Sequence, residues 1–109
     1  MNKAYILIIL LLPVVFIQCK SSKVSTTSGM LEETKVETIK KNFTAAQMEE
    51  GRILWQDRCD NCHKLFKPES YTVNRFDKVL PRMTKRSKMT EEEAAKVRAY
   101  LLVNAKRST

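Results

Sequence analysis

The chain has 109 residues, a formal net charge of +8, three cysteines and a single histidine. At this length it holds at most one small domain, and one histidine leaves no second imidazole for an ordinary zinc site. The net positive charge favours interaction with acidic partner surfaces or with an anionic membrane. We expect no nucleic-acid binding, because no helix with clustered base-reading side chains is present.

Residues 1–18 have the composition of an export signal. Lys3 gives a short positive start, and residues 4–17 form an apolar run that is shorter than the roughly 20 residues of a spanning helix. The run ends next to Cys19 and resembles a bacterial lipoprotein signal, whose cysteine carries the lipid. Lipidation would also remove a lone thiol that is a liability in an oxidising compartment.

We therefore expect residues 1–18 to be a signal peptide. Lipidated Cys19 would then hold the mature chain to a membrane on the periplasmic side of a bacterial cell envelope. The alternatives are an uncleaved N-terminal anchor and a soluble periplasmic protein.

Residues 20–42 are rich in Ser, Thr, Lys and Glu, and their apolar residues are too sparse to build a core. Together with Cys19 this segment, residues 19–42, is predicted to be a flexible tether. A weak helix over residues 31–41 is the alternative.

Residues 43–107 are expected to form an all-α domain, because no stretch alternates apolar and polar residues for long enough to make a sheet. Thr44 and Gln47 form a capping-box pair at the start of a helix that runs to residue 58. Cys59 would then leave the last turn of this helix.

A second helix is predicted to begin near Asn74. Its apolar residues share one face at helical spacing: Phe76, Val79, Leu80 and Met83. Proline removes a helix hydrogen bond and disfavours α geometry at the residue before it. We therefore expect a kink or an end at Pro81, with Met83 in or just beyond the break.

The last helix has the clearest signals. Thr90 and Glu93 form a second capping box, and Met89 and Ala94 are placed as a hydrophobic staple. Acidic and basic residues complement the two ends of the helix dipole: Glu91, Glu92 and Glu93 at the start, Lys106 and Arg107 at the end. The expected buried stripe is Ala94, Val97, Tyr100, Leu101 and Asn104, with Leu102 on its flank.

The chemistry of the chain centres on residues 59–63, Cys-Asp-Asn-Cys-His, which have the spacing of a c-type haem attachment motif. Cys59 and Cys62 would bind the two vinyl groups of the haem, and His63 would bind the iron. A dithiol redox motif would need a βαβ context, and zinc would need roughly four ligands in total. Neither context is present, so we expect one covalent haem c per chain.

Other residues around this motif resemble class I c-type cytochromes. In that family a glycine lies eight residues before the first haem cysteine and an aromatic residue four before it, here Gly51 and Trp55. An aromatic residue and a leucine near the end of the last helix correspond to Tyr100 and Leu101. The resemblance implies a small cytochrome c-like fold over residues 43–107, in which N- and C-terminal helices cross beside the haem and a third helix lies near a ligand methionine.

The segment after the motif is similar to a shorter bacterial subgroup, in which a proline and a Tyr-Thr pair follow closely. The resemblance implies that the Pro68 carbonyl accepts the Nδ1 proton of His63. Tyr71 would reach a haem propionate or serve as ordinary packing. The haem crevice would be lined by Trp55, Pro68, Tyr71, Phe76, Leu80, Tyr100 and Leu101.

Met83 is the favoured sixth ligand, because a thioether suits iron and its spacing before Thr90 is close to that of the family. Met89 is the alternative, although its place before Thr90 favours packing. A haem with both iron positions filled transfers electrons, so we expect a one-electron carrier and no enzyme. Its partners would be redox proteins with acidic docking surfaces, met by a monomer through Lys64, Lys67, Lys85 and Lys88. A five-coordinate haem sensor or weak peroxidase is the alternative function.

Overall fold

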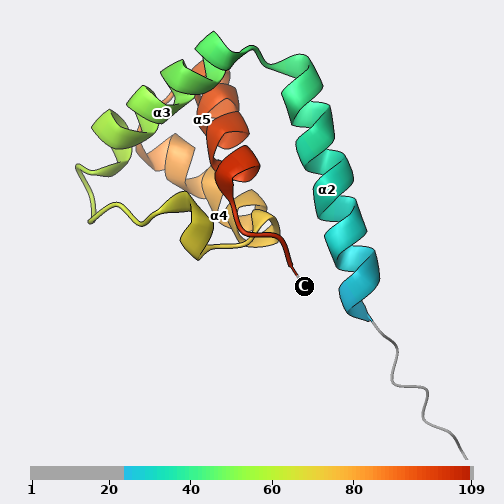
Figure 1. The fold of residues 1–109 in the computed structure, drawn as a ribbon. Coiled ribbons are helices and arrows are strands. Elements are labelled where there is room, and N and C mark those ends of the chain that lie inside the picture. The colour runs from blue at the N-terminus through green and yellow to red at the C-terminus, as the bar shows by residue number, and fades with distance from the viewer. Residues whose placement is uncertain (1–23, 109) are drawn as a thin grey trace, which may run out of the picture.

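The computed structural model describes residues 24–108, which form four α-helices and one short 3-10 helix (Figure 1). The elements are α2 (Val24–Asn42), α3 (Ala45–Cys59), η1 (Pro68–Ser70), α4 (Val73–Arg86) and α5 (Glu91–Asn104). Within these residues the only β pairing is an isolated bridge between Thr72 and Lys106, so the predicted all-α class is confirmed.

The predicted signal peptide and Cys19 lie outside the described residues. Between residues 24 and 108, no helix combines the length and the apolar character that a membrane crossing requires.

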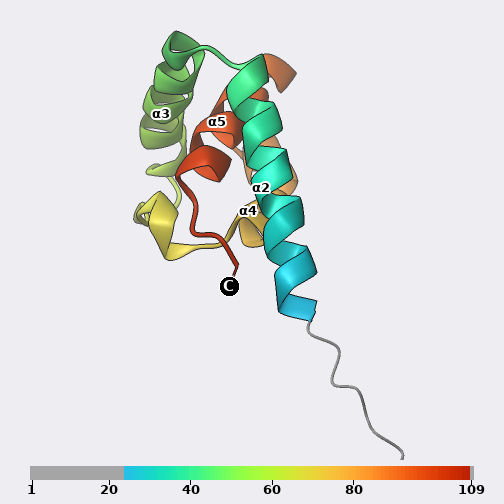
Figure 2. The same cartoon turned by 45° about the vertical axis from the view of Figure 1, so that its right-hand side comes forward.

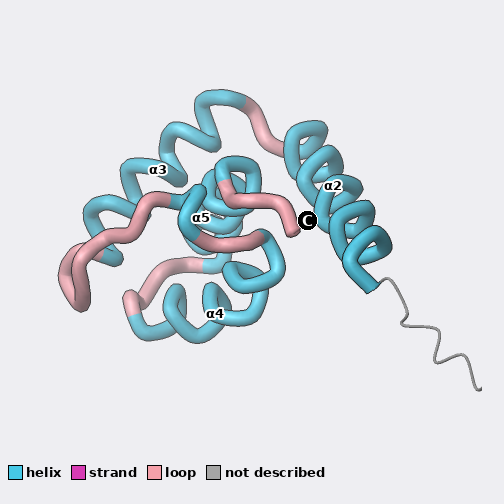
Figure 3. Tube along the Cα trace, turned by 60° about the horizontal axis from the view of Figure 1, so that its bottom comes forward, coloured by secondary structure: helices cyan, strands magenta, loops and turns pink. Residues whose placement is uncertain are grey.

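Helix α3 begins as its sequence predicts. The Thr44 hydroxyl accepts the Gln47 backbone N–H, the Gln47 side chain accepts the Thr44 N–H, and the helix ends at Cys59. Helix α3 lies against α5, and Gly51 is buried where the two meet (Figure 3). A Cβ atom at Gly51 would clash with the Lys96 carbonyl group and lie 3.1 Å from the Val97 nitrogen. Glycine therefore permits this close backbone approach.

Helix α5 also begins with its predicted capping box, between Thr90 and Glu93. Its buried face differs from the expected stripe. Val97 and Leu101 are buried as predicted. Ala99 and the flanking Leu102 are buried as well, as is Ala105 just after the helix. Asn104 is exposed instead, while Ala94 and Tyr100 are half-buried. The reason is that α5 is covered on more than one side, by α3, α4 and α2, so its apolar surface is wider than one stripe.

The C-terminal residues also depart from expectation, because α5 ends at Asn104 and its last turn holds no basic residue. Lys106 and Arg107 lie beyond it. The Arg107 guanidinium still donates to the carbonyl oxygens of Leu102 and Ala105, at 3.5 and 2.7 Å, so it satisfies acceptors near the helix end.

Helix α4 does not end at Pro81, which excludes one of the two outcomes expected there; it continues to Arg86, and Met83 lies inside it. Phe76, Leu80 and Thr84 are buried on the face toward the core, and the Thr84 hydroxyl donates to the Leu80 carbonyl at 2.9 Å. Tertiary packing on this face outweighs the single helix bond that Pro81 removes.

The prediction of a flexible tether is wrong for residues 24–42, which form α2, and the alternative of a helix over residues 31–41 is confirmed in a longer form. Val36 and Ile39 are 0% and 5% exposed and belong to the hydrophobic core, against which Phe43 also packs. These three residues follow one another at helical spacing, so α2 presents a narrow apolar face. Two views show α2 running beside the domain, with the chain's C-terminal residues near its lower half (Figures 1 and 2).

Candidate functional site

The Cys-Asp-Asn-Cys-His motif lies where α3 gives way to a loop. Cys59 is the last residue of α3, and the chain then turns, with the Cys62 N–H donating to the Cys59 carbonyl at 3.4 Å. The Asn61 side chain donates to the Asp57 carbonyl at 2.8 Å and supports this turn. Both cysteines are free thiols, half-buried at Cys59 and exposed at Cys62.

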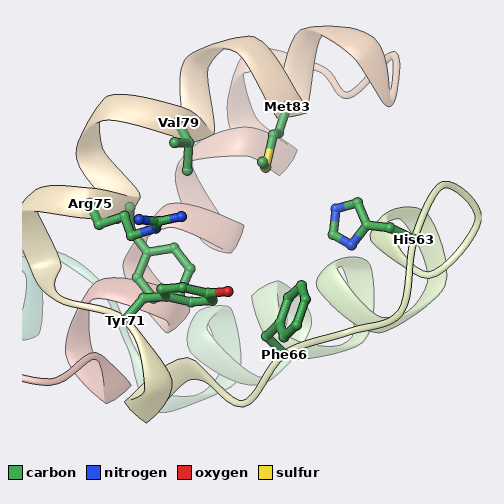
Figure 4. A pocket seen from close by; sticks show the side chains of 7 residues that line it. His63, Phe66, Tyr71, Arg75, Val79 and Met83 are labelled. Atoms are coloured by element: carbon green, nitrogen blue, oxygen red, sulfur yellow. The ribbon is translucent and has the colours of Figure 1, made fainter.

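A cavity of about 280 Å³ opens beside the motif (Figure 4). His63 reaches it from the loop after α3, and Met83 points into it from α4 on the other side. Its complete lining is His63, Phe66, Tyr71, Arg75, Phe76, Val79 and Met83. The walls are thus mostly aromatic and aliphatic, with an imidazole and a thioether among them.

A second cavity of about 130 Å³ adjoins the motif itself. Its lining is Cys59, Cys62, His63, Met83, Arg86 and Ser87. His63 and Met83 belong to both cavities. The structure therefore brings together both motif cysteines, the histidine and the methionine that the sequence favoured.

The other methionines of the described chain lie elsewhere. Met89 is half-buried against the hydrophobic core, and its backbone N–H donates to the Thr84 carbonyl at 3.1 Å. Met48 packs against the same core, and Met30 is exposed on α2. None of the three lines either cavity. Met83 is thus the methionine placed to act with His63, and its role as a ligand stays a prediction.

The partner of the His63 ring differs from the one that the family resemblance implied. Nδ1 lies 2.9 Å from the Lys64 carbonyl oxygen, whereas the Pro68 carbonyl accepts the Tyr71 N–H at 3.2 Å. The 3-10 turn beginning at Pro68 uses that carbonyl locally, which accounts for the difference. A carbonyl only accepts, so in a neutral ring with this hydrogen bond the proton is on Nδ1 and the lone pair is on Nε2.

Aromatic rings connect His63 to α4. The ring centroids of His63 and Phe66 are 6.1 Å apart, and Phe66 meets Tyr71 edge-on at 5.6 Å. Tyr71 in turn meets Phe76 edge-on at 5.9 Å, and the Arg75 guanidinium lies 4.7 Å above the Tyr71 ring. Such edge-to-face contacts favour fixed ring orientations, so these residues form a defined wall.

The predicted crevice residues divide into two groups. Tyr71 and Phe76 line the larger cavity. The other five residues do not line it. Pro68, Leu80 and Leu101 are buried, and the rings of Trp55 on α3 and Tyr100 on α5 pack at a tilt, with centroids 5.6 Å apart.

The prediction omitted Phe66, Arg75 and Val79 from this lining. Val79 shares the apolar face of Phe76 and Met83, so its periodicity was a usable signal. For Phe66 the only signal was nearness to His63 in the sequence. Nothing in the sequence singled out Arg75.

The electrostatics of the motif disfavour thiol exchange. Burial raises the pKa of the Cys59 thiol, and the neighbouring Cys62 adds to the increase. A reactive dithiol needs the opposite, a lowered pKa. Among residues 24–108, no three His, Cys, Asp or Glu side chains gather as a metal site. Comparison with known proteins adds nothing to this geometry, because the chain matches no protein-family model, no curated protein and no solved structure.

Proposed function

We propose that this chain is a monohaem c-type cytochrome that carries single electrons. The observation that carries the proposal is the placement of His63 and Met83 in the same apolar cavity beside Cys59 and Cys62. A cavity that offers two thiols at the haem-attachment spacing, an imidazole and a thioether matches the donor set of haem c.

The rest of the site fits such a group. Phe66, Tyr71, Phe76 and Val79 give a large planar apolar ligand the non-polar surface that it needs. The backbone approach at Gly51 and the Trp55–Tyr100 contact, at positions that the family resemblance picked out, support a cytochrome c-like fold.

Each residue would then have a distinct task. Cys59 and Cys62 would hold haem through thioether bonds, while His63 and Met83 would bind its iron. The hydrogen bond between His63 Nδ1 and the Lys64 carbonyl oxygen orients the ring and leaves Nε2 available for a metal. When bound, haem supplies one-electron iron chemistry, and a methionine ligand raises its potential relative to two histidines.

Electron transfer between proteins, rather than catalysis, is the role that this donor set favours. Four exposed lysines, Lys64, Lys67, Lys85 and Lys88, lie on the motif loop and around the end of α4. None of them belongs to an ion pair within residues 24–108, so they remain available to an acidic partner surface. We further propose a periplasmic monomer anchored at Cys19.

Covalent attachment gives the test, and the three cysteines of the chain supply the control. Full-length protein is made in a bacterial host with haem-attachment machinery, and the haem is extracted with acid-acetone. We expect the wild type and Cys19→Ser to retain haem, and Cys59→Ser/Cys62→Ser to lose it. Release of the haem from the wild type would contradict the proposal.

A further inference from the structure

The first turn of α4 is held by three separate segments. The first N–H groups of a helix have no partner within it. Here the Arg75 N–H donates to Thr72 Oγ1 at 3.3 Å, a local cap. The Val73 N–H donates to the Lys106 carbonyl at 3.2 Å, and the Asn74 N–H to Glu32 Oε1 of α2 at 3.2 Å. Two of these three contacts are therefore long-range in sequence.

Glu32 is the centre of this arrangement. Glu32 is only 1% exposed. Its carboxylate also accepts hydrogen bonds from the Ser108 N–H at 2.6 Å and from the Ser108 hydroxyl at 2.9 Å. Helix α4 has no acidic residue of its own in the first turn. Glu32 thus supplies negative charge to the positive end of α4 from another helix, a favourable interaction with the helix dipole.

A second carboxylate ties the same helices together further along. Asp77 of α4 pairs with Lys35 of α2 and accepts two hydrogen bonds from the Arg98 guanidinium of α5, at 3.0 and 2.7 Å. Glu32 and Lys35 are neighbours on one face of α2, one turn apart. Helix α2 therefore contacts α4 through two charged groups.

Helix α4 is also the helix that lines the larger cavity. Arg75 and Phe76 directly follow Asn74, and Val79 and Met83 continue along the same helix. Helix α4 is continuous from Val73 to Arg86, with Pro81 inside it, so a shift of its first turn also changes the position of Met83. Figure 4 shows Met83 and Arg75 entering the cavity from the same ribbon.

We infer that α2 positions the cavity wall and that Glu32 is its positioning residue, because the Glu32 carboxylate fixes the first turn of α4 and thereby sets Met83 opposite His63. The role of Glu32 in fixing the first turn of α4 does not depend on a cofactor. Its role in placing Met83 as an iron ligand rests on the proposed function. Since α2 follows Cys19 closely in the chain, part of the segment expected to be a flexible tether supports the site.

The test compares two glutamates of α2 in the full-length protein. The carboxylate of Glu32 has two oxygens that accept hydrogen bonds from three donors, and Glu32→Gln leaves only one accepting oxygen. Glu37→Gln is the matched control, because Glu37 is exposed and pairs only with Lys40 of its own helix. Amide hydrogen exchange is followed residue by residue. We expect exchange at residues 73–76 to be about tenfold faster in Glu32→Gln and unchanged in Glu37→Gln.

Two further variants separate positioning from a general loss of stability. Glu32→Asp, which keeps both oxygens, should recover part of the protection, and Lys35→Met should loosen α4 near Asp77 without touching Glu32. Equal acceleration in all four helices, or none in α4, would overturn the inference.

The haem-loaded protein gives the second reading. Glu32→Gln should weaken the far-red band of methionine-ligated ferric haem, while Glu37→Gln should not. An unchanged band in Glu32→Gln would overturn the link to Met83. A wild type that takes up no haem would instead contradict the proposed function, and the exchange result would still decide the role of Glu32.

Discussion

Two helix contacts hold this domain together by different physical means. Helices α3 and α5 meet backbone to backbone at Gly51, where no side chain stands between them. Helices α2 and α4 are joined by side chains, through Glu32 to the Asn74 N–H and through Lys35 to Asp77. The first contact depends on the lack of a side chain and tolerates no added atom. The second depends on charge and hydrogen bonding, so it responds to pH and to single polar substitutions.

The largest expected effect is at the backbone contact. Gly51→Ala places a Cβ against the Lys96 carbonyl. Relieving this clash requires α3 and α5 to move apart, which would disrupt the packing between them. We expect the free energy of unfolding to fall by about 3 kcal/mol or more, despite the better helix propensity of alanine. Urea unfolding followed by circular dichroism measures it.

Gly29→Ala is the matched control in α2. Its Cβ would make one close backbone contact, 2.9 Å from the Ser108 carbonyl oxygen, whereas a Cβ at Gly51 would overlap the Lys96 carbonyl group much more deeply. We expect a smaller cost, about 1 kcal/mol, because the overlap is shallow and alanine's helix propensity offsets part of it. Equal costs for the two glycines would refute the distinction between the two contacts.

The apolar face of α2 gives the next largest effect. Ile39 is 5% exposed in the core, and Leu31 of the same helix is 65% exposed. Ile39→Ala should lower the free energy of unfolding by about 2 kcal/mol, and Leu31→Ala should change it by less than about 0.5 kcal/mol. The same urea titration decides. If both substitutions are neutral, α2 does not contribute to the folded core.

The polar contact gives the smallest effect, as a pH dependence. Burial by itself would raise the pKa of Glu32, but hydrogen bonds from Ser108 and Asn74 and the charge of Arg107 outweigh it and lower that pKa. For Asp77 burial acts likewise, and bonds from Lys35 and Arg98 lower its pKa.

A carboxyl group whose pKa is lower in the folded state stabilises the fold above its unfolded pKa and loses that contribution as the pH falls through the folded value. The ordinary pKa values are 4.5 for Glu and 3.8 for Asp. We therefore expect stability to decline below about pH 4.5. Glu32→Gln should flatten this decline by about 1 kcal/mol. An identical pH profile in wild type and variant would show that Glu32 has no part in it.

The sequence predicted the elements whose signals are local. Both capping boxes, Thr44 with Gln47 and Thr90 with Glu93, lie where expected, because a cap needs only residues three apart. The helix end expected as one outcome at Pro81 is absent for the opposite reason: the local penalty of proline is offset by the packing of Phe76, Leu80 and Thr84, which no local pattern reveals.

Helix α2 was predicted only as an alternative, a weak helix over residues 31–41, because its attachments are polar and distant in sequence. From the sequence alone, Glu32 and Lys35 look like solvent-exposed charged residues, because their partners Asn74, Asp77 and Ser108 are distant in the chain. For the site, periodicity placed Met83 and Phe76 on one face of a helix, and the structure puts both at the cavity. Arg75 carried no comparable signal, because a guanidinium over a tyrosine ring is a matter of tertiary packing.

The most direct test of the proposed function is the far-red charge-transfer band of the ferric, haem-loaded protein, compared in the wild type, Met83→Ala and Met89→Leu. Met83 lines both cavities, whereas Met89 packs against the core. We expect a band in the wild type and in Met89→Leu, and its loss in Met83→Ala together with new carbon monoxide binding. Loss of the band in Met89→Leu alone would assign the ligand to Met89, and a wild type that lacks the band and binds carbon monoxide readily would contradict electron transfer in favour of a five-coordinate haem sensor or weak peroxidase.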